Sequence, residues 1–531
     1  MRTLLLNGFV HTPDDPGATA VLIDGDMIAW VGHEGAALAQ RDGVDQVVDL
    51  QGALVTPAFV DAHVHVTATG MNLGGLDLTD TTGAADVLRR VADHCQSVTA
   101  GDVVLGHGWD ESTWPDATLP SLGELDIAAG DVALYLTRID VHSALTSSAM
   151  LRRLPAVRDK DGFDASGLLR SDAHHFARGS VLDTITAAQR DRLHTSALSH
   201  FAAAGVAAVH EMAGPDISSE KDLTALLSRD PSDDPQITAY WGELGGAQRA
   251  RELGAIGAGG DLFADGALGS HTAWLSDDYA DRATRGVAHV TAPEVADHVV
   301  ECTELGVQAG FHVIGDAALS EVLAGFRSAA TKLGPTALRA ARHRLEHVEM
   351  PTPDALTTMA ELGITASVQP QFDALWGGPD AMYAARLGES RAATMNPFSE
   401  FSRRGITMAF GSDTPVTAVT PWHTVAAAIH HRTPQWRITA RSAFTAHTRG
   451  GWRAVGIDDA GVIRPGFRAH LAVWDASDLM VQAPDERVAA WSTDPSSGTP
   501  LLPTLSEYGP YPACRLTISG GRLIHSDGQL M

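Results

Sequence analysis

Two histidines one residue apart are the first residues in the chain with a clear potential for chemistry. His63 and His65 follow a short apolar run, Ala58 to Val60. In an extended strand, side chains at positions i and i+2 point to the same face, so the two imidazoles would project side by side. Neutral imidazole is the commonest protein ligand for zinc and related metals. The chain has 24 histidines, and such a pair also arises by chance, so the metal interpretation needs support from other segments.

Three later segments give that support. His312, His347 and Asp413 each stand where an apolar, strand-like run ends. In a parallel barrel, polar residues at the carboxyl ends of strands converge on the reaction centre. Imidazoles together with a carboxylate form a suitable nitrogen and oxygen site for zinc. Each residue alone could be an ordinary loop residue, but their order along the chain predicts one shared metal site.

The middle of the chain alternates strand-like runs with helical stretches, which is the pattern of parallel α/β structure. After the histidine strand we predict seven more strands, giving the eight that close a (β/α)8 TIM barrel over residues 56–459. These are Val206 to His210, Ile237 to Trp241, Asp261 to Ala264, Val307 to His312, His343 to Glu346, Ile364 to Val368 and Thr407 to Phe410. Helices are expected at 292–304, capped by Thr291, and at 353–362, ended by Gly363.

Two further units are expected around the barrel. Residues 1–55 and 460–531 are rich in short strands and predict one small β-sandwich domain built from both termini. Residues from about 70 to 195 do not fit the eightfold pattern and hold strands and helices of their own. We interpret them as an inserted α/β segment after the first barrel strand, lying over the active site.

The composition narrows the functional class. The chain has 531 residues, 44% hydrophobic, and a formal net charge of -27. Such an acidic balance argues against nucleic acid or an anionic membrane as the main partner. The N-terminal apolar run is too short for a signal peptide, and no stretch reaches the roughly 20 apolar residues of a membrane span. With only three scattered cysteines, we expect a cytoplasmic protein without a disulfide framework.

Several stretches together resemble a known family. They are residues 56–65, 108–111, 138–145, 262–270, 312–317, 344–347 and 411–415. The chain resembles the amidohydrolase superfamily, and within it the branch called amidohydrolase family 3, or YtcJ-like. The resemblance runs from about residue 3 to 525, and the combination of motifs is specific for the family but not for a substrate.

The resemblance implies roles for the residues. His63 and His65 would bind the metal, and His312 and His347 would bind metal or, for His347, contact the substrate. Asp413 would touch the metal-bound water, take its proton as hydroxide attacks a carbonyl carbon, and return it to the leaving nitrogen. Zinc is the expected ion, with Fe²⁺ or Mn²⁺ as alternatives.

One position departs from the family pattern. Many relatives carry a lysine at the end of the fourth strand, where this chain has Asp261 after Gly259 and Gly260. Three outcomes follow: a single metal, a carboxylate bridge between two metals, or a site that has lost activity. We favour one metal per chain.

Four other residues are candidates for substrate binding. Trp109, Arg138 and His142 belong to the inserted segment, and Asp265 follows the predicted fourth strand. The alternatives are packing for Trp109, a local hydrogen-bond network for Arg138 and His142, and a structural role for Asp265.

The sequence thus predicts a metal-dependent hydrolase that cleaves a non-peptide carbon–nitrogen bond, in particular of an N-substituted amide. A deaminase or a cyclic-amide or carbamate hydrolase on the same scaffold is the alternative enzyme. A barrel that has lost catalysis and only binds a ligand is the alternative from another class, because of Asp261. The expected partner is a small-molecule substrate, and a homodimer is the default assembly.

Overall fold

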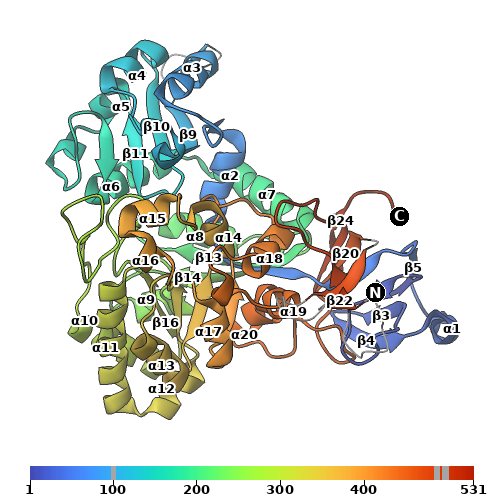
Figure 1. The fold of residues 1–531 in the computed structure, drawn as a ribbon. Coiled ribbons are helices and arrows are strands. Elements are labelled where there is room, and N and C mark those ends of the chain that lie inside the picture. The colour runs from blue at the N-terminus through green and yellow to red at the C-terminus, as the bar shows by residue number, and fades with distance from the viewer. Residues whose placement is uncertain (97, 99–102, 477, 483–490, 493–500, 531) are drawn as a thin grey trace.

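An eight-stranded parallel sheet forms the centre of the computed structural model, which describes residues 1–96, 98, 103–476, 478–482, 491–492 and 501–530 (Figure 1). The strands run in the order β19-β18-β17-β16-β15-β14-β13-β7, and a bridge between Val64 and Thr414 joins the two edges. The predicted (β/α)8 barrel is therefore confirmed. Its strands are β7 (Phe59–Val64), β13 (Val206–Ala213), β14 (Gln236–Trp241), β15 (Gly257–Ala258), β16 (Gln308–Val313), β17 (Arg344–His347), β18 (Thr365–Val368) and β19 (Met408–Phe410).

The fourth strand differs from the prediction. It is the two-residue β15, and Asp261 lies beyond it rather than at the start of a strand at 261–264. Gly259 packs directly on Gly310, where a Cβ atom would lie 2.5 Å from the backbone nitrogen, and Gly260 turns the chain with a φ of +76°. After this turn Phe263 pairs again with His312 in an isolated bridge. The turn carries Asp261 to the carboxyl end of the barrel.

Helices surround the barrel, as Figure 1 shows. The two helices predicted with their caps are confirmed, because α10 begins with a capping box of Thr291 and Glu294 and α13 ends at Gly363 with a φ of 67°. None of the described helices combines the length and apolar character that a membrane-spanning segment needs. The helices packed around the barrel are α7 (Ala187–Ala203), α8 (Glu220–Leu227), α9 (Ala247–Leu253), α10 (Ala292–Leu305), α11 (Asp316–Leu333), α13 (Pro353–Leu362), α17 (Phe398–Arg403), α18 (Pro421–Ile429) and α19 (Ala440–Thr445).

The inserted segment forms a separate five-stranded mixed sheet at one end of the barrel (Figure 1). Its strands are β8 (Leu76–Asp77), β9 (Val103–Trp109), β10 (Ala133–Arg138), β11 (Ser143–Thr146) and β12 (Leu168–Arg170). Helices α3 (Ala84–Cys95), α4 (Leu122–Ala129), α5 (Ser148–Arg153) and α6 (Ser171–Leu182) pack beside it. Helix α7 contributes Leu198 and Phe201 to the barrel core, so the boundary expected near residue 195 cuts through a barrel helix.

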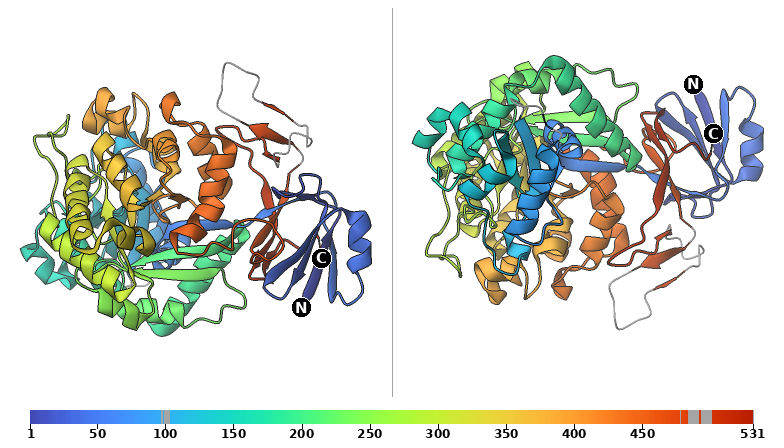
Figure 2. Two further views of the ribbon diagram at one scale, coloured as in Figure 1. Left: turned by 90° about the horizontal axis from the view of Figure 1, so that it is seen from below. Right: turned by 90° about the horizontal axis from the view of Figure 1, so that it is seen from above.

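Strands from both ends of the chain build two further sheets, and both termini lie in this lobe (Figure 2). One sheet holds β1 (Arg2–Leu6), β3 (Ala20–Asp24), β4 (Met27–Gly32) and β5 (Gln46–Asp49); the other holds β2 (Phe9–Val10), β6 (Leu54–Pro57), β20 (Leu471–Asp475), β24 (Ala513–Ser519) and β25 (Arg522–Ser526). Val21 and Ile23 of one sheet share a core with Val473 and Ile518 of the other. Residues 483–490 and 493–500 of the predicted domain lie outside the described part of the chain.

Candidate metal centre

The histidine pair sits at the mouth of the barrel, at the carboxyl end of β7. Every residue of this strand is buried, as expected for a barrel strand covered on both faces. His63 and His65 are 0% and 8% exposed, and their ring centroids lie 5.4 Å apart. The alternation of the strand therefore places both rings on the same side, as the spacing predicts.

Three imidazoles are held in one orientation by partners on their Nδ1 atoms. Nδ1 of His63 lies 2.9 Å from Oε2 of Glu346, and Nδ1 of His65 lies 3.1 Å from the carbonyl oxygen of Met212. Nδ1 of His347 lies 2.9 Å from Oε1 of Gln369. With Nδ1 donating, Nε2 of each ring keeps its lone pair. Such a hydrogen bond fixes the tautomer and orientation of metal-binding histidines.

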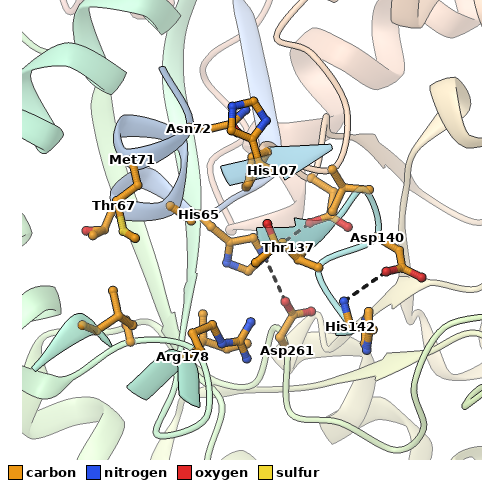
Figure 3. A pocket seen from close by; sticks show the side chains of 18 of the residues that line it. His65, Thr67, Met71, Asn72, His107, Thr137, Asp140, His142, Arg178 and Asp261 are labelled. Atoms are coloured by element: carbon orange, nitrogen blue, oxygen red, sulfur yellow. Dashed lines mark hydrogen bonds and ion pairs between the residues drawn. The ribbon is translucent and has the colours of Figure 1, made fainter. Parts of the chain in front are cut away.

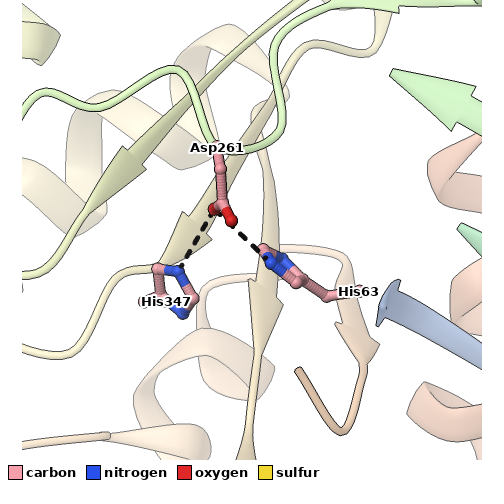
Figure 4. A group of neighbouring side chains, drawn as sticks. All are labelled: His63, Asp261 and His347. Atoms are coloured by element: carbon pink, nitrogen blue, oxygen red, sulfur yellow. Dashed lines mark ion pairs between the residues drawn. The ribbon is translucent and has the colours of Figure 1, made fainter. Parts of the chain in front are cut away.

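Two carboxylates, Asp261 and Asp413, meet these Nε2 atoms, and Figures 3 and 4 show Asp261 beside the histidines. Asp261 Oδ2 lies 3.1 Å from Nε2 of His65, and its Oδ1 lies 3.4 Å from Nε2 of His63 and 3.7 Å from Nε2 of His347. Asp413 Oδ1 lies 3.4 Å from Nε2 of His63 and 3.3 Å from that of His65. The aspartate at the position of the family lysine thus reaches the histidines. We refer to His63, His65, Asp261, His347 and Asp413 as the donor cluster.

The donor cluster contains buried polar atoms without partners. Nε2 of His63 and Oδ1 of Asp261 make no hydrogen bond, although buried polar atoms are almost always paired. Donor atoms of His63, Asp261 and His347, and separately of His63, His65 and Asp413, lie within 4.8 Å of one another. A divalent cation would satisfy these atoms, and the mixed nitrogen and oxygen set suits zinc, iron or manganese. The residues therefore fit a metal.

The electrostatics of the donor cluster agree with this fit. Burial alone would lower the pKa of His65, but Asp261 and Asp413 raise it to about 9. Burial would likewise raise the pKa of Asp261, yet the neighbouring histidines hold it well below its ordinary value. The negative charge of the two carboxylates thus stabilises positive charge at the centre, which protons or a metal ion can supply.

Two members of the donor cluster have left-handed backbones. The φ angles are 69° at His347 and 57° at Asp413, a conformation that non-glycine residues rarely adopt. The backbone N–H of Asp413 donates to the carbonyl of His63 at 2.8 Å, which fixes the aspartate beside the histidine strand. Such uncommon conformations concentrate at functional sites, where the surrounding structure holds them.

A buried ion pair supports the histidine strand from below. Arg344 donates to Glu346 at 2.6 and 2.8 Å and to the carbonyl of Ala62 at 2.7 Å, and both charged side chains are fully buried. Arg344 holds the pKa of Glu346 at about 2 against the effect of burial, so the carboxylate that orients His63 stays charged. Sequence reasoning gave Glu346 and Gln369 no role. The available signal was that each polar residue lies at the carboxyl end of a barrel strand.

His312 lies beside the donor cluster but outside both groups of convergent donor atoms among the described residues. Its ring centroid is 4.5 Å from that of His347, and its Nδ1 is 3.6 Å from Oδ1 of Asp265. It lines the cavity described below. His312 therefore lies next to the donor cluster but belongs to neither group of convergent donor atoms.

Asp265 does not fit the expected substrate contact. Its side chain is fully buried, and its oxygens accept the backbone N–H groups of Trp274, Ile314 and Gly315 at 2.9, 3.0 and 2.7 Å. Both oxygens are thus occupied in holding the loop after β15 against the end of β16. These hydrogen bonds favour the structural alternative for Asp265.

Trp109 and Arg138 are both buried, which favours packing for Trp109 and a local hydrogen-bond network for Arg138. Trp109 is 1% exposed, donates from Nε1 to the carbonyl of Leu136 at 2.8 Å, and packs in the core of the inserted sheet. Arg138 is 2% exposed and forms ion pairs with three carboxylates of the inserted segment, those of Asp110, Glu111 and Asp140. Neither is free to contact a substrate, because burial and internal bonds occupy both side chains.

A cavity of about 110 Å³ opens beside the donor cluster (Figure 3). The barrel contributes His65, Asp261, His312, His347 and Asp413 to its wall. The inserted segment contributes Leu105, His107, Thr137, His142 and Arg178, so His142 lies in the cavity wall. The barrel therefore presents the chemical groups, and the inserted segment closes the space above them.

Comparison with known proteins decides the family. Residues 46–525 match the model of the amidohydrolase family. The chain belongs to amidohydrolase family 3. It is 25% identical to the putative amidohydrolase YtcJ of Bacillus subtilis, over 79% of this chain and 82% of that one. It is 24% identical to the N-substituted formamide deformylase of Arthrobacter pascens, over 90% of this chain and 94% of that one.

A solved structure supports the assignment of the chain to this family. The crystal structure of an uncharacterized metal-dependent hydrolase from Pyrococcus furiosus superposes with a TM-score of 0.70 at 26% identity, covering 90% of this chain and 99% of that one. Together with the donor cluster, these matches identify the protein as a metal-dependent amidohydrolase acting on carbon–nitrogen bonds.

Proposed function

We propose that this amidohydrolase cleaves the non-peptide carbon–nitrogen bond of an N-substituted amide, with a single zinc ion in the donor cluster. The observation that carries the proposal is the convergence of imidazole nitrogens and two carboxylates at the mouth of the barrel, beside a cavity. The similarity to an N-substituted formamide deformylase along nearly the whole chain supports this substrate class over a ring amidine.

The proposed single ion follows from the place of His63. Both groups of three donors include His63, whose Nδ1 is occupied by Glu346. Only Nε2 remains to bind a cation, and one lone pair serves one ion. His63, His65, Asp261 and His347 would hold the metal, and Asp261 would take the place of the family lysine. Zn²⁺ is the proposed ion because it favours this mixed donor set, with Fe²⁺ and Mn²⁺ as competitors.

Asp413 is the proposed proton carrier. A bound zinc ion would act as a Lewis acid and lower the pKa of a water molecule at the site. Asp413 lines the cavity, and its carboxylate would accept a proton from the attacking water and deliver it to the leaving nitrogen. His347 lies on the same wall, and because its Nδ1 donates to Gln369 and its Nε2 would bind the metal, it would act as a ligand rather than as a hydrogen-bond donor to the substrate.

The other proposals concern the setting of the reaction. The described chain has three free cysteines, Cys95, Cys302 and Cys514, which suits a reducing cytoplasm. The proposed partner is a small-molecule substrate rather than nucleic acid or a membrane, on the grounds of the acidic surface. A homodimer is proposed only because it is the commonest assembly, and light scattering on the purified protein tests it.

The experiment is an activity screen of the zinc-loaded protein over N-formyl and N-acetyl amines, cyclic amides, carbamates and aminopurines. The proposal predicts release of formate or acetate from the N-substituted amides, and no release after the metal is removed with a chelator. Ammonia release from aminopurines, or ring opening alone, would establish the deaminase or cyclic-amide alternative. Metal binding without turnover of any compound would favour a ligand-binding protein.

A further inference from the structure

Arg178 is a cation in the wall of the active-site cavity that no part of the proposed reaction uses. It is carried by α6 of the inserted segment and lines the same cavity as His65 and Asp261. Figure 3 shows its guanidinium in the space that these residues enclose. An arginine stays charged at neutral pH, so its position needs an explanation.

Arg178, which is half-buried, lacks the carboxylate partner that the fully buried Arg138 and Arg344 have. Its Nη2 donates to the carbonyl oxygen of Asp216, and its Nε is buried without a hydrogen bond. In the part of the chain that the structure describes, no carboxylate lies within ion-pair distance of it, whereas Arg138 and Arg344 have acidic partners at 2.6 to 2.9 Å. Burial lowers the pKa of Arg178. A guanidinium so placed is stabilised when an anion enters the cavity.

The surroundings of Arg178 add hydrogen-bond donors, while the acidic groups that act on it, Asp216 and Asp261, form no ion pair with it among the described residues. His142 and His175 line the same cavity, and burial lowers their pKa, to about 3 for His142. Both rings are therefore neutral and can each donate one N–H. His175 stacks on the ring of Phe263 at 5.4 Å, which holds it at the wall. Leu105, Leu182 and Ile217 supply apolar wall beside these groups.

We propose that Arg178 binds a carboxylate on the substrate, so that the substrate class is an amide that carries a carboxylate, such as an N-acyl amino acid. This inference rests on the proposed function. A planar guanidinium binds a carboxylate through two parallel hydrogen bonds and so fixes its orientation. With the carboxylate held by the inserted segment, the amide is placed against the donor cluster of the barrel, which raises the chance of reaction.

The test compares two substrates that differ only in the carboxylate: N-formyl-leucine and N-formyl-isopentylamine. Formate release is measured for the zinc-loaded wild type, Arg178→Met, Arg178→Gln and Arg178→Lys. Arg152→Met, which removes an exposed arginine of α5, is the matched control. We expect the wild type to prefer N-formyl-leucine by about 100-fold in kcat/KM, and Arg178→Met and Arg178→Gln to lose that preference. Arg178→Lys should keep part of it, and Arg152→Met all of it.

The second substrate separates the possible failures. Unchanged cleavage of N-formyl-isopentylamine by the Arg178 variants shows that they are folded and loaded. Equal cleavage of both substrates by the wild type, or a preference that survives in Arg178→Met and Arg178→Gln, overturns the role of Arg178 and leaves the proposed function intact.

A binding measurement decides the matter if neither substrate is cleaved, which would count against the proposed function itself. Calorimetry then compares 4-methylvalerate with 4-methylvaleramide on the same proteins. A carboxylate preference that falls about 100-fold in Arg178→Met supports the inference. A carboxylate that binds the metal instead keeps its affinity in that variant, and this result overturns it.

Discussion

Two buried groups of acidic residues lie close to the same cavity, and only one is complete within the chain. Arg138 is surrounded by Asp110, Glu111 and Asp140 at 2.7, 2.9 and 2.9 Å, normal distances for charge-assisted hydrogen bonds. We call this group the arginine cluster. In the donor cluster, carboxylate oxygens and imidazole nitrogens face each other at 3.1 to 3.7 Å, and some make no hydrogen bond. In the arginine cluster the central cation is Arg138, a residue of the chain. In the donor cluster a bound metal ion would take that place.

The arginine cluster joins the inserted segment to the barrel. Ser270 donates to Asp140 at 2.9 Å, Trp376 to Asp110 at 3.3 Å, and Arg386 to Glu111 at 3.3 Å. The backbone N–H of His142 donates to Asp140 at 3.2 Å, so the cluster also positions a residue of the cavity wall. The difference between the two groups predicts that mutations in one act on stability and in the other on metal and catalysis.

Replacing Asp413 with asparagine should have the largest effect. The amide keeps the shape and the hydrogen-bonding oxygen but cannot carry the proton, so we expect kcat to fall about 10² to 10⁴-fold. The variant should fold and retain most of its metal, which elemental analysis of the purified protein checks. Asp233→Asn, in an exposed loop, is the matched control. Equal turnover by Asp413→Asn and the wild type would remove Asp413 from its role.

Replacing Arg138 with methionine should act mainly on stability. It leaves the buried carboxylates of Asp110 and Asp140 without their cation, which costs about 3 to 5 kcal/mol of unfolding free energy. Denaturant unfolding of this variant and of the exposed control Arg152→Met measures the loss. Metal content of the folded protein should not change. A variant that loses its metal while remaining as stable as the wild type would contradict the assignment of stability to the arginine cluster and of metal binding to the donor cluster.

Replacing Glu346 with glutamine should have a smaller effect, on metal affinity. The amide oxygen still accepts the N–H of His63, but the negative charge that strengthens the other nitrogen as a ligand is gone. We expect about tenfold weaker metal binding, measured by competition with a chromogenic chelator. Glu243→Gln, which alters a carboxylate bonded to Trp241 at 2.7 Å, serves as the control. Unchanged affinity in Glu346→Gln would place His63 outside the set of ligands.

Acidification should reduce the difference in unfolding free energy between Arg138→Met and the wild type. Although burial opposes it, Arg138 holds the pKa of Asp140 below its ordinary value of 3.8. A carboxyl group with a depressed pKa in the folded state adds stability above the unfolded pKa and loses it as pH falls through the folded one. The gap in unfolding free energy should therefore be widest near pH 7 and narrow as the pH falls below about 4. A gap that widens in acid would contradict this assignment.

The sequence predicted the elements with strong local signals. The helix 353–362 begins at a threonine and a proline and ends at a glycine, and the structure has the same limits. The histidine strand and the strands before His347 and Asp413 were also found, since each is a short apolar run with a polar end. What local signals could not give was distance: Asp261 reaches three imidazoles only because the Gly259–Gly260 turn moves it out of the sheet.

The partners of the site residues were harder to predict because they are far apart in the chain. Glu346 orients His63 across 283 positions, and Arg178 shares a cavity wall with Asp413. The burial of Trp109 and the three N–H groups bound by Asp265 likewise depend on the packed structure. Residue type predicted which side chains do chemistry, and the fold decided which of them meet.

The metal content of the purified protein tests the central claim most directly. Elemental analysis before and after treatment with a chelator, and after reloading with zinc, counts the ions per chain, while thermal unfolding reports whether they bind the folded state. The account predicts one ion per chain, a lower Tm after its removal and recovery on reloading. A protein that neither retains nor takes up a divalent ion, or that takes up two, would contradict it.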